Sequence, residues 1–179
     1  MKPRTVVLFA VVAGLSAAAG VSYHLWSRGS GAGPAMAPDA VVERVLSVRV
    51  ADVKGGTQSL EQWRGQVLVV NYWATWCAPC REEIPGFVRL QERYGSRGLQ
   101  FVGIAIDQPD KVAEFASEFR INYPLLLGGL ETIDLLRQAG NRAGVLPYTL
   151  VIDRNGNLVS REPGGLKEAR LESLIQRLL

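Results

Sequence analysis

Two residue types that carry much of enzyme chemistry are scarce in this chain. It contains only two cysteines, Cys77 and Cys80, and one histidine, His24, which lies in an apolar N-terminal run. Without a third cysteine, no structural disulfide can form elsewhere. The chain after the apolar run has no histidine, which excludes a Cys–His nucleophile pair and any His-ligated metal site from it. We therefore expect neither a metal nor a bound cofactor, and the chemistry must come from the two cysteines.

Net charge is also missing once the N-terminal segment is set aside. Three basic residues, Lys2, Arg4 and Arg28, precede residue 34 without any acidic residue, and the 17 basic residues that follow balance 17 acidic ones. A neutral domain offers no electrostatic reason to bind nucleic acid or anionic lipid. We expect no nucleic-acid partner.

The apolar N-terminal run has the length of a membrane span. Residues 5–26 contain no Asp, Glu, Lys or Arg, and as a helix they would measure roughly 33 Å, about one bilayer core. The basic residues before the run favour an orientation with that end inside. Tyr23 and Trp26 fall where interfacial aromatic residues belong.

These features predict three parts. Residues 1–27 form a signal-anchor transmembrane segment, residues 28–38 a flexible linker, and residues 39–179 a domain on the periplasmic or extracytoplasmic side of the inner membrane. The alternative is a cleaved signal peptide, because residues 17–19 are alanines that a peptidase could recognise. Cleavage would leave a soluble periplasmic domain.

The two cysteines lie between a predicted strand and a predicted helix. The apolar run from Val67 to Trp73 is typical of a buried strand, and apolar residues recur at helical spacing from Ile84 to Tyr94. A thiol at the start of a helix is close to unpaired backbone N–H groups and to the positive end of the helix dipole. Both favour the thiolate, which predicts an exposed, nucleophilic Cys77. Cys80, almost one turn further, is placed to resolve a mixed disulfide on Cys77.

The remaining pattern predicts a mixed sheet covered by helices. Val41 to Val53 is interpreted as a leading strand or strand pair, and Ser59 to Gly65 as a short helical turn ended by glycine. The other predicted strands are 98–106, 123–127, 144–153 and 158–160, and the other predicted helices are 109–119, 131–139 and 167–179.

The motifs together resemble the thioredoxin fold. They are the sequence Trp76-Cys77-Ala78-Pro79-Cys80 after an apolar strand, Pro85 in the following helix, and Val145-Leu146-Pro147 before a later strand. The anchor, the extra leading strand and the added segment around 122–144 are similar to the membrane-tethered TlpA/ResA branch. The resemblance spans residues 39–179 and implies a three-layer α/β/α domain.

The resemblance also implies roles for individual residues. Pro147 matches the cis-proline of the family, and Leu146 before it matches the residue that pairs through its backbone with the substrate chain. The residues between the cysteines tune the redox potential in the family. We expect Trp76, Ala78 and Pro79, like Leu146, to contact the substrate.

Asn71 departs from the thioredoxin pattern. Thioredoxins carry a buried aspartate at this strand position that helps deprotonate the second cysteine, whereas asparagine does not titrate. Glu83 is the candidate replacement, because it lies three residues after Cys80 on the same helix face, and ResA-type members carry a matching glutamate. Burial should raise the pKa of Glu83, which suits a proton shuttle for Cys80. A solvated helix acid is the alternative.

The predicted function is a membrane-anchored thiol-disulfide oxidoreductase that reduces client proteins. Family analogy points to apocytochrome c or copper-site assembly proteins as clients. The apolar run contains no cysteine, so a separate membrane electron donor of the DsbD/CcdA type is implied. Two alternatives remain open: an oxidant that introduces disulfides, and a non-catalytic module that docks a partner. A peroxidase is disfavoured because no cysteine exists outside the pair.

Overall fold

The structure, a computed structural model, describes residues 37–179 except for the side chain of Pro38. The predicted transmembrane segment 1–27, and the linker up to residue 36, lie outside the described residues. Within residues 37–179, no helix has both the length and the apolar character needed to cross a bilayer.

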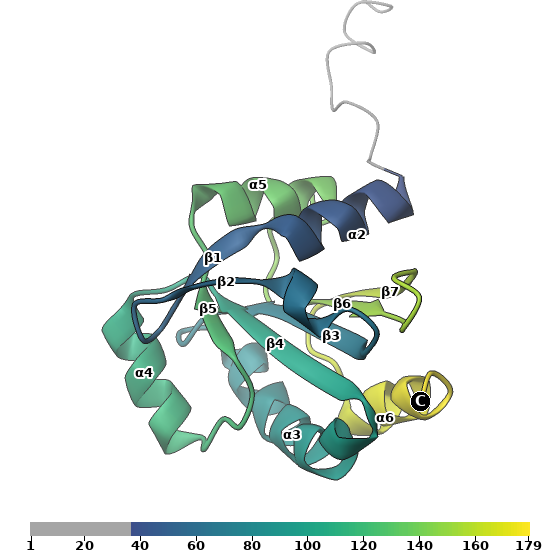
Figure 1. The fold of residues 1–179 in the computed structure, drawn as a ribbon. Helices are drawn as coiled ribbons and strands as arrows, with labels where there is room; N and C mark the ends of the chain where they lie inside the picture. Colours follow the sequence, from purple (N-terminus) through teal and green to yellow (C-terminus); the bar gives the residue numbers. More distant parts are fainter. Residues whose placement is uncertain (1–36) are drawn as a thin grey trace, which may run out of the picture. The chain divides into compact units, whose positions relative to one another are not determined.

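A seven-stranded mixed sheet forms the centre of the domain (Figure 1), in the order β2-β1-β5-β4-β3-β6-β7. Strands β3, β4 and β5 are parallel, and the other neighbours pair antiparallel. The bounds are β1 Arg49–Asp52, β2 Thr57–Ser59, β3 Val67–Trp73, β4 Leu99–Ala105, β5 Leu125–Leu127, β6 Tyr148–Ile152 and β7 Leu158–Pro163. The predicted mixed sheet is confirmed.

Helices cover both faces of the sheet, which confirms the three-layer architecture. Buried residues of α3 (Ala78–Tyr94), α4 (Pro109–Glu118) and α6 (Glu168–Gln176) pack on one face. Those of α2 (Pro38–Ser47) and α5 (Leu130–Gln138) pack on the other (Figure 1). Two short 3-10 helices, η1 (Leu60–Trp63) and η2 (Gly95–Arg97), complete the fold.

The prediction of strand structure from Val41 onward is wrong for its first half. Residues Pro38–Ser47 form helix α2, and only β1 at 49–52 and β2 at 57–59 are strands. Val41, Val42, Val45 and Leu46 are all buried on one helix face. Their spacing therefore follows the helical period, and β-branched valines in this segment mimic a strand while meeting the requirement of an apolar helix face.

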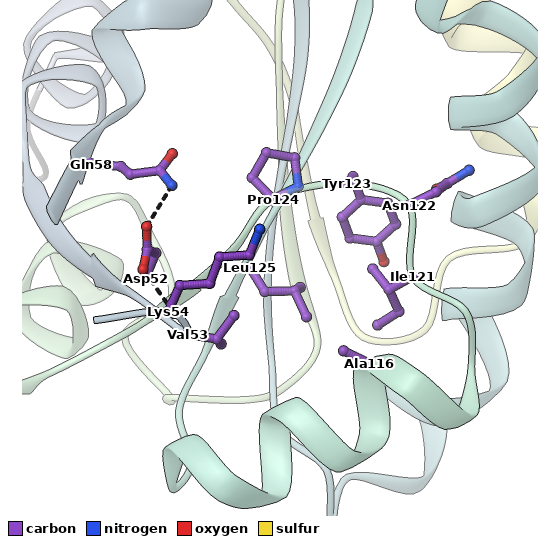
Figure 2. A pocket seen from close by; sticks show the side chains of 10 residues that line it. All are labelled: Asp52, Val53, Lys54, Gln58, Ala116, Ile121, Asn122, Tyr123, Pro124 and Leu125. Carbon is purple, nitrogen blue, oxygen red and sulfur yellow. Dashed lines mark hydrogen bonds between the residues drawn. The ribbon is translucent and has the colours of Figure 1, made fainter. Parts of the chain in front are cut away.

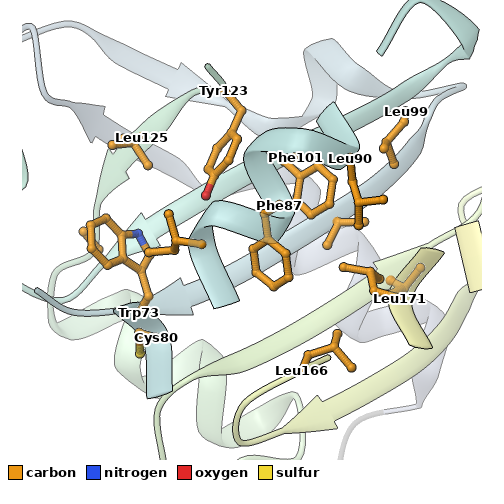
Figure 3. Packing of buried hydrophobic residues seen from close by; sticks show 14 of the residues in the cluster. Trp73, Cys80, Phe87, Leu90, Leu99, Phe101, Tyr123, Leu125, Leu166 and Leu171 are labelled. Carbon is orange, nitrogen blue, oxygen red and sulfur yellow. The ribbon is translucent and has the colours of Figure 1, made fainter. Parts of the chain in front are cut away.

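One face of the core is packed around aromatic side chains of β3, β4 and α3 (Figure 3). Phe87 stacks on Phe101 with ring centroids 5.1 Å apart, and Trp73 meets Phe115 at 4.9 Å. Gly103 of β4 leaves room for the indole, since a Cβ there would lie 3.0 Å from Trp73 Nε1 and 2.6 Å from Leu125 Cδ2. This packing fixes the strand from which the cysteine motif leaves.

The sheet topology gathers distant segments at one edge. The ends of β3 and β4 lie side by side, with Trp73 opposite Ala105, and β6 begins at Tyr148 opposite Tyr72. The loops after β3, after β4 and before β6 therefore meet beyond this edge. They carry Cys77, Asp107 and Pro147.

A separate cavity of about 450 Å³ lies between the β1–β2 hairpin, α4 and β5 (Figure 2). Asp52 and Gln58 form a hydrogen bond of 2.8 Å at its wall. None of the residues lining it belongs to the cysteine motif or to the predicted site.

Candidate active site

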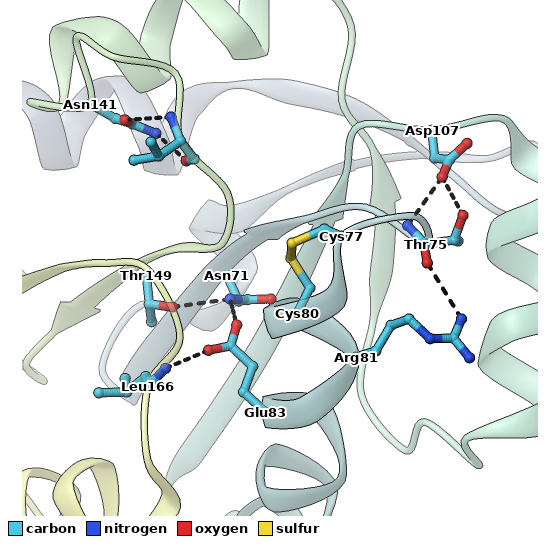
Figure 4. Close-up of a disulfide and its surroundings, with 11 residues drawn as sticks. Asn71, Thr75, Cys77, Cys80, Arg81, Glu83, Asp107, Asn141, Thr149 and Leu166 are labelled. Atoms are coloured by element: carbon cyan, nitrogen blue, oxygen red, sulfur yellow. Dashed lines mark hydrogen bonds between the residues drawn. A yellow bond between two sulfur atoms is a disulfide. The ribbon is translucent and has the colours of Figure 1, made fainter.

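The two cysteines form a disulfide at the start of α3 (Figure 4). The S–S distance is 2.12 Å and the Cα atoms are 5.3 Å apart. Cys77 is the N-cap residue of α3, and its carbonyl accepts the first helical hydrogen bond, from Arg81 N at 3.1 Å. After reduction, a thiolate on Cys77 would therefore lie at the positive end of a 17-residue helix.

Both cysteines are buried, which corrects the expectation that Cys77 is exposed. Cys77 is 5% exposed and Cys80 is fully buried, and both belong to the apolar cluster beneath α3. The large exposed side chain of the motif is Trp76, at 68%. The disulfide ties the Cys77 sulfur to Cys80, whose side chain lies in the core, so the Cys77 side chain is turned inward as well. A client protein therefore contacts the exposed Trp76 side chain before it reaches the sulfur of Cys77.

The loop that precedes Cys77 is tied to the neighbouring strand. Asp107, two residues after β4, accepts hydrogen bonds from the backbone N–H and the hydroxyl of Thr75. These donors lower the pKa of Asp107 despite the opposing effect of its desolvation. The carboxylate therefore stays ionised and fixes the loop that carries Trp76 and Cys77.

The loop before β6 confirms the predicted cis-proline. The Leu146–Pro147 peptide bond is cis, Pro147 is buried, and Leu146 is partly buried against the apolar cluster that contains both cysteines. Asn141 holds this loop in place through two hydrogen bonds to the backbone of Val145 (Figure 4). Its Oδ1 accepts from Val145 N at 3.0 Å, and its Nδ2 donates to Val145 O at 2.7 Å.

Exposed apolar side chains surround the disulfide. Trp76, Ala78 and Pro79 are exposed on the α3 side, and Val145 is 45% exposed on the loop opposite. Two of the four large exposed apolar side chains in the described chain, Trp76 and Val145, thus lie at this edge of the sheet. We call this set, with Leu146, the apolar rim.

Glu83 is buried behind the disulfide and is linked to β3. It is 6% exposed, its Oε1 accepts from Asn71 Nδ2 at 2.9 Å, and its Oε2 accepts from Leu166 N at 2.8 Å. Burial raises the pKa of Glu83 to about 7, and the two hydrogen bonds partly offset that rise. The carboxyl therefore exchanges its proton near neutral pH. Glu82 is exposed on the outer face of α3.

A groove of about 330 Å³ connects Glu83 with solvent. It is lined by Pro79 and Leu166 and by the charged residues Glu82, Arg89, Lys167 and Glu168. Neither cysteine lines this groove, so it offers the buried carboxyl a route for proton exchange with solvent that does not pass the disulfide.

Three polar residues of the site were not predicted from the sequence: Asp107, Asn141 and Thr149. Thr149 lies directly opposite Asn71 in the β3–β6 ladder and accepts a hydrogen bond of 3.0 Å from Asn71 Nδ2. The sequence feature that could have identified Thr149 is its position two residues after Pro147 in an otherwise apolar strand. Asp107 and Asn141 act through hydrogen bonds to loop residues. No local sequence pattern distinguishes them from other polar residues.

Comparisons with known proteins agree with this geometry. Residues 35–161 match the AhpC/TSA family. A thiol-disulfide oxidoreductase ResA from Geobacillus thermodenitrificans is 30% identical over 158 residues, covering 87% of this chain and 82% of that protein. A thiol-disulfide oxidoreductase ResA from Geobacillus kaustophilus is 28% identical over 130 residues, covering 72% of each chain.

A solved structure gives the same result. The crystal structure of a thiol:disulfide interchange protein of the thioredoxin family from Chlorobium tepidum superposes with a TM-score of 0.68 at 31% identity. The match covers 83% of this chain and 99% of that one. The fold, the cysteine pair and the cis-proline loop of this chain are thus those of a protein that exchanges disulfides.

Proposed function

The chain belongs to the AhpC/TSA family and is a thiol-disulfide oxidoreductase related to ResA, and on this premise we propose that it reduces disulfides in client proteins outside the cytoplasm. The apolar rim around the Cys77–Cys80 pair supports this assignment. An apolar surface around a reactive sulfur suits an extended or unfolded polypeptide that presents a cysteine.

The proposed reaction takes place in two exchanges. The Cys77 thiolate attacks one sulfur of a client disulfide, so that a mixed disulfide forms and the other client sulfur leaves as a thiolate. Cys80, once deprotonated, attacks the Cys77 sulfur and releases the second client sulfur. The products are a client dithiol and the Cys77–Cys80 disulfide. Glu83 accepts the Cys80 proton in this scheme, and the groove beside Pro79 returns that proton to solvent.

We propose that four residues contact the client protein: Leu146, Trp76, Ala78 and Pro79. Leu146 lies beside the buried Pro147 at the start of β6, where its backbone can pair with an extended client segment. Trp76 offers a large exposed ring next to Cys77.

The redox potential of the Cys77–Cys80 pair tests the direction of the reaction. A reductant is expected to equilibrate below about −220 mV, and an oxidant near −120 mV. The measurement is a titration of the disulfide in dithiothreitol and glutathione buffers. A value near the oxidant end would replace the reductase proposal by the alternative that the protein introduces disulfides.

Trapping identifies the clients, which we propose to be apocytochrome c or copper-site assembly proteins. A Cys80→Ser variant cannot release a captured client, so mixed disulfides through Cys77 accumulate. The double variant lacking both cysteines is the control. If the single variant captures nothing that the double variant lacks, and Cys77 alkylation leaves the biological activity unchanged, the protein is a non-catalytic docking module.

The proposed location is the inner membrane, with residues 1–27 as the anchor and the domain in the periplasm. A reductant kept there needs electrons from the cytoplasm, and we propose a membrane donor of the DsbD/CcdA type. Fractionation of the full chain decides between an anchored and a cleaved protein. Removal of the donor should leave the Cys77–Cys80 pair oxidised in cells.

A further inference from the structure

The side-chain amide of Asn71 has one atom that the oxidised site does not use. Asn71 is 1% exposed, and both of its side-chain hydrogen bonds come from Nδ2, which donates to Glu83 Oε1 and Thr149 Oγ1. Its Oδ1 is buried without a hydrogen-bond partner among the described residues. A buried carbonyl oxygen normally has a partner, so this one needs an explanation.

The position of Asn71 places the unused oxygen near the cysteines. Along β3, Val69, Asn71 and Trp73 point to the same side of the sheet, because side chains alternate, and that side is covered by α3. Glu83 lies on α3 within one turn of Cys80. Figure 4 shows Asn71 with its nitrogen toward Thr149 and its oxygen pointing away from Thr149, to the side where Cys80 lies.

We propose that Asn71 Oδ1 accepts a hydrogen bond from the Cys80 thiol of the reduced enzyme. In the disulfide the Cys80 sulfur carries no hydrogen, so the oxygen has nothing to accept. Reduction by a dithiol donor breaks the S–S bond, adds two electrons and two protons, and leaves the donor as a disulfide. One of these protons resides on Cys80 and makes the missing hydrogen bond. The inference deepens the proposed function, since it concerns the resolving thiol of the same pair.

The hydrogen bond from Nδ2 to the Glu83 carboxylate strengthens the proposed contact. A donor that binds an anion becomes more polarised, and the carbonyl of the same amide becomes a better acceptor. The arrangement favours the neutral thiol at Cys80 and leaves ionisation to Cys77, at the helix start. Asn71 is thus a positioning residue that assigns the proton between the two sulfurs.

Infrared spectroscopy of the Cys80 thiol tests this directly. The Cys77→Ser variant has one thiol, and its S–H stretching band lies at lower wavenumber when the S–H group donates a hydrogen bond. We expect that low band at a pH above the Glu83 pKa of about 7. Adding Asn71→Leu, which has a similar shape and no acceptor, should shift the band to higher wavenumber. Should the leucine variant not fold, Asn71→Ala makes the same comparison.

Tyr72→Phe in the Cys77→Ser background is the matched control. Tyr72 is the next residue of β3, points to the opposite face, and carries another buried polar atom without a partner. This control should leave the S–H band unchanged. If Asn71→Leu and Asn71→Ala also leave it unchanged, the inference is wrong even when disulfide exchange proceeds normally. Conversely, suppose that the S–H band shifts in Asn71→Leu while the wild-type protein fails to exchange disulfides. That outcome would reject only the proposed function.

Discussion

Asn71 Nδ2 and Glu83 Oε1 lie 2.9 Å apart and join the central strand β3 to the helix that carries both cysteines. Both residues are buried, and the asparagine amide supplies one of the two hydrogen bonds that hold the Glu83 carboxyl. The pair combines an acid that titrates near neutral pH with a neighbour that does not titrate. Its energetics can therefore be tested one residue at a time.

The first prediction concerns the Asn71→Leu variant. The amide hydrogen bond lowers the pKa of Glu83, so its loss should raise that pKa from about 7. A hydrogen bond to a charged group contributes about 1.5–3 kcal/mol, which corresponds to a rise of about one to two pKa units. Carboxyl carbon NMR titration of the oxidised protein measures it. Tyr72→Phe should leave the value unchanged, and an unaltered Glu83 titration in N71L would contradict the hydrogen bond.

The second prediction concerns the pH dependence of stability. Glu83 has a folded pKa of about 7 against an ordinary value of 4.5. Between these values the folded state binds more protons than the unfolded one, so the Glu83 contribution falls as pH rises through that window. The fall amounts to about 3 kcal/mol at most. Glu83→Gln should lack it, so the oxidised variant should gain stability relative to the wild type from pH 4.5 to pH 7.

Urea unfolding of the oxidised proteins across this pH range makes the measurement. Glu82→Gln is the control, because Glu82 is the exposed neighbour of Glu83 on α3. Parallel pH curves for the wild type and E83Q would show that Glu83 is ionised in both states, contrary to its buried position.

The third prediction concerns the loop that carries Leu146 and Pro147. Asn141 makes two hydrogen bonds to Val145 and is 3% exposed. Asn141→Ala should cost about 1–3 kcal/mol of unfolding free energy, because it removes two hydrogen bonds that hold the loop. It should slow exchange with an unfolded disulfide-containing protein more than exchange with dithiothreitol, since only the protein needs an ordered loop.

Asn157→Ala is the matched control for that variant. Asn157 lies in the exposed turn between β6 and β7 and hydrogen-bonds Asp153. It should leave both exchange rates at the wild-type value. Equal slowing of both substrates by N141A would mean that the loop acts on the cysteines themselves and not on the client.

The sequence predicted the elements whose signals are local. β3 and the start of α3 follow from an uninterrupted apolar run, a cysteine pair and a change to helical spacing. All seven residues of β3 are buried, as expected for a central strand of a sheet that helices cover on both faces. The cis state of the Leu146–Pro147 bond came from the family resemblance, since the two residues alone favour a trans bond.

The features that could not be predicted from the sequence depend on contacts between segments that are distant along the chain. Thr75 and Asp107 are 32 residues apart, and Asn71 and Thr149 are 78 apart. Only the register of the sheet brings each pair together. Helix α2 was missed for a different reason, because its buried valines satisfy helix and strand patterns in so short a segment. Burial of Cys77 likewise depends on how the first turn of α3 packs.

The last prediction separates client binding from redox chemistry. Trp76 is 68% exposed, whereas the adjacent Cys77 is only 5% exposed. The indole ring can therefore contact a client without determining the environment of the disulfide. Trp76→Ala should slow exchange with an unfolded protein about tenfold, the usual effect of losing an aromatic contact worth about 1.4 kcal/mol. The redox potential should stay at the wild-type value. Val159→Ala, an exposed apolar residue at the start of β7, is the control and should change neither quantity. A shifted potential in W76A would assign the ring to the chemistry of the cysteines, whereas an unchanged protein rate would remove Trp76 from the client surface.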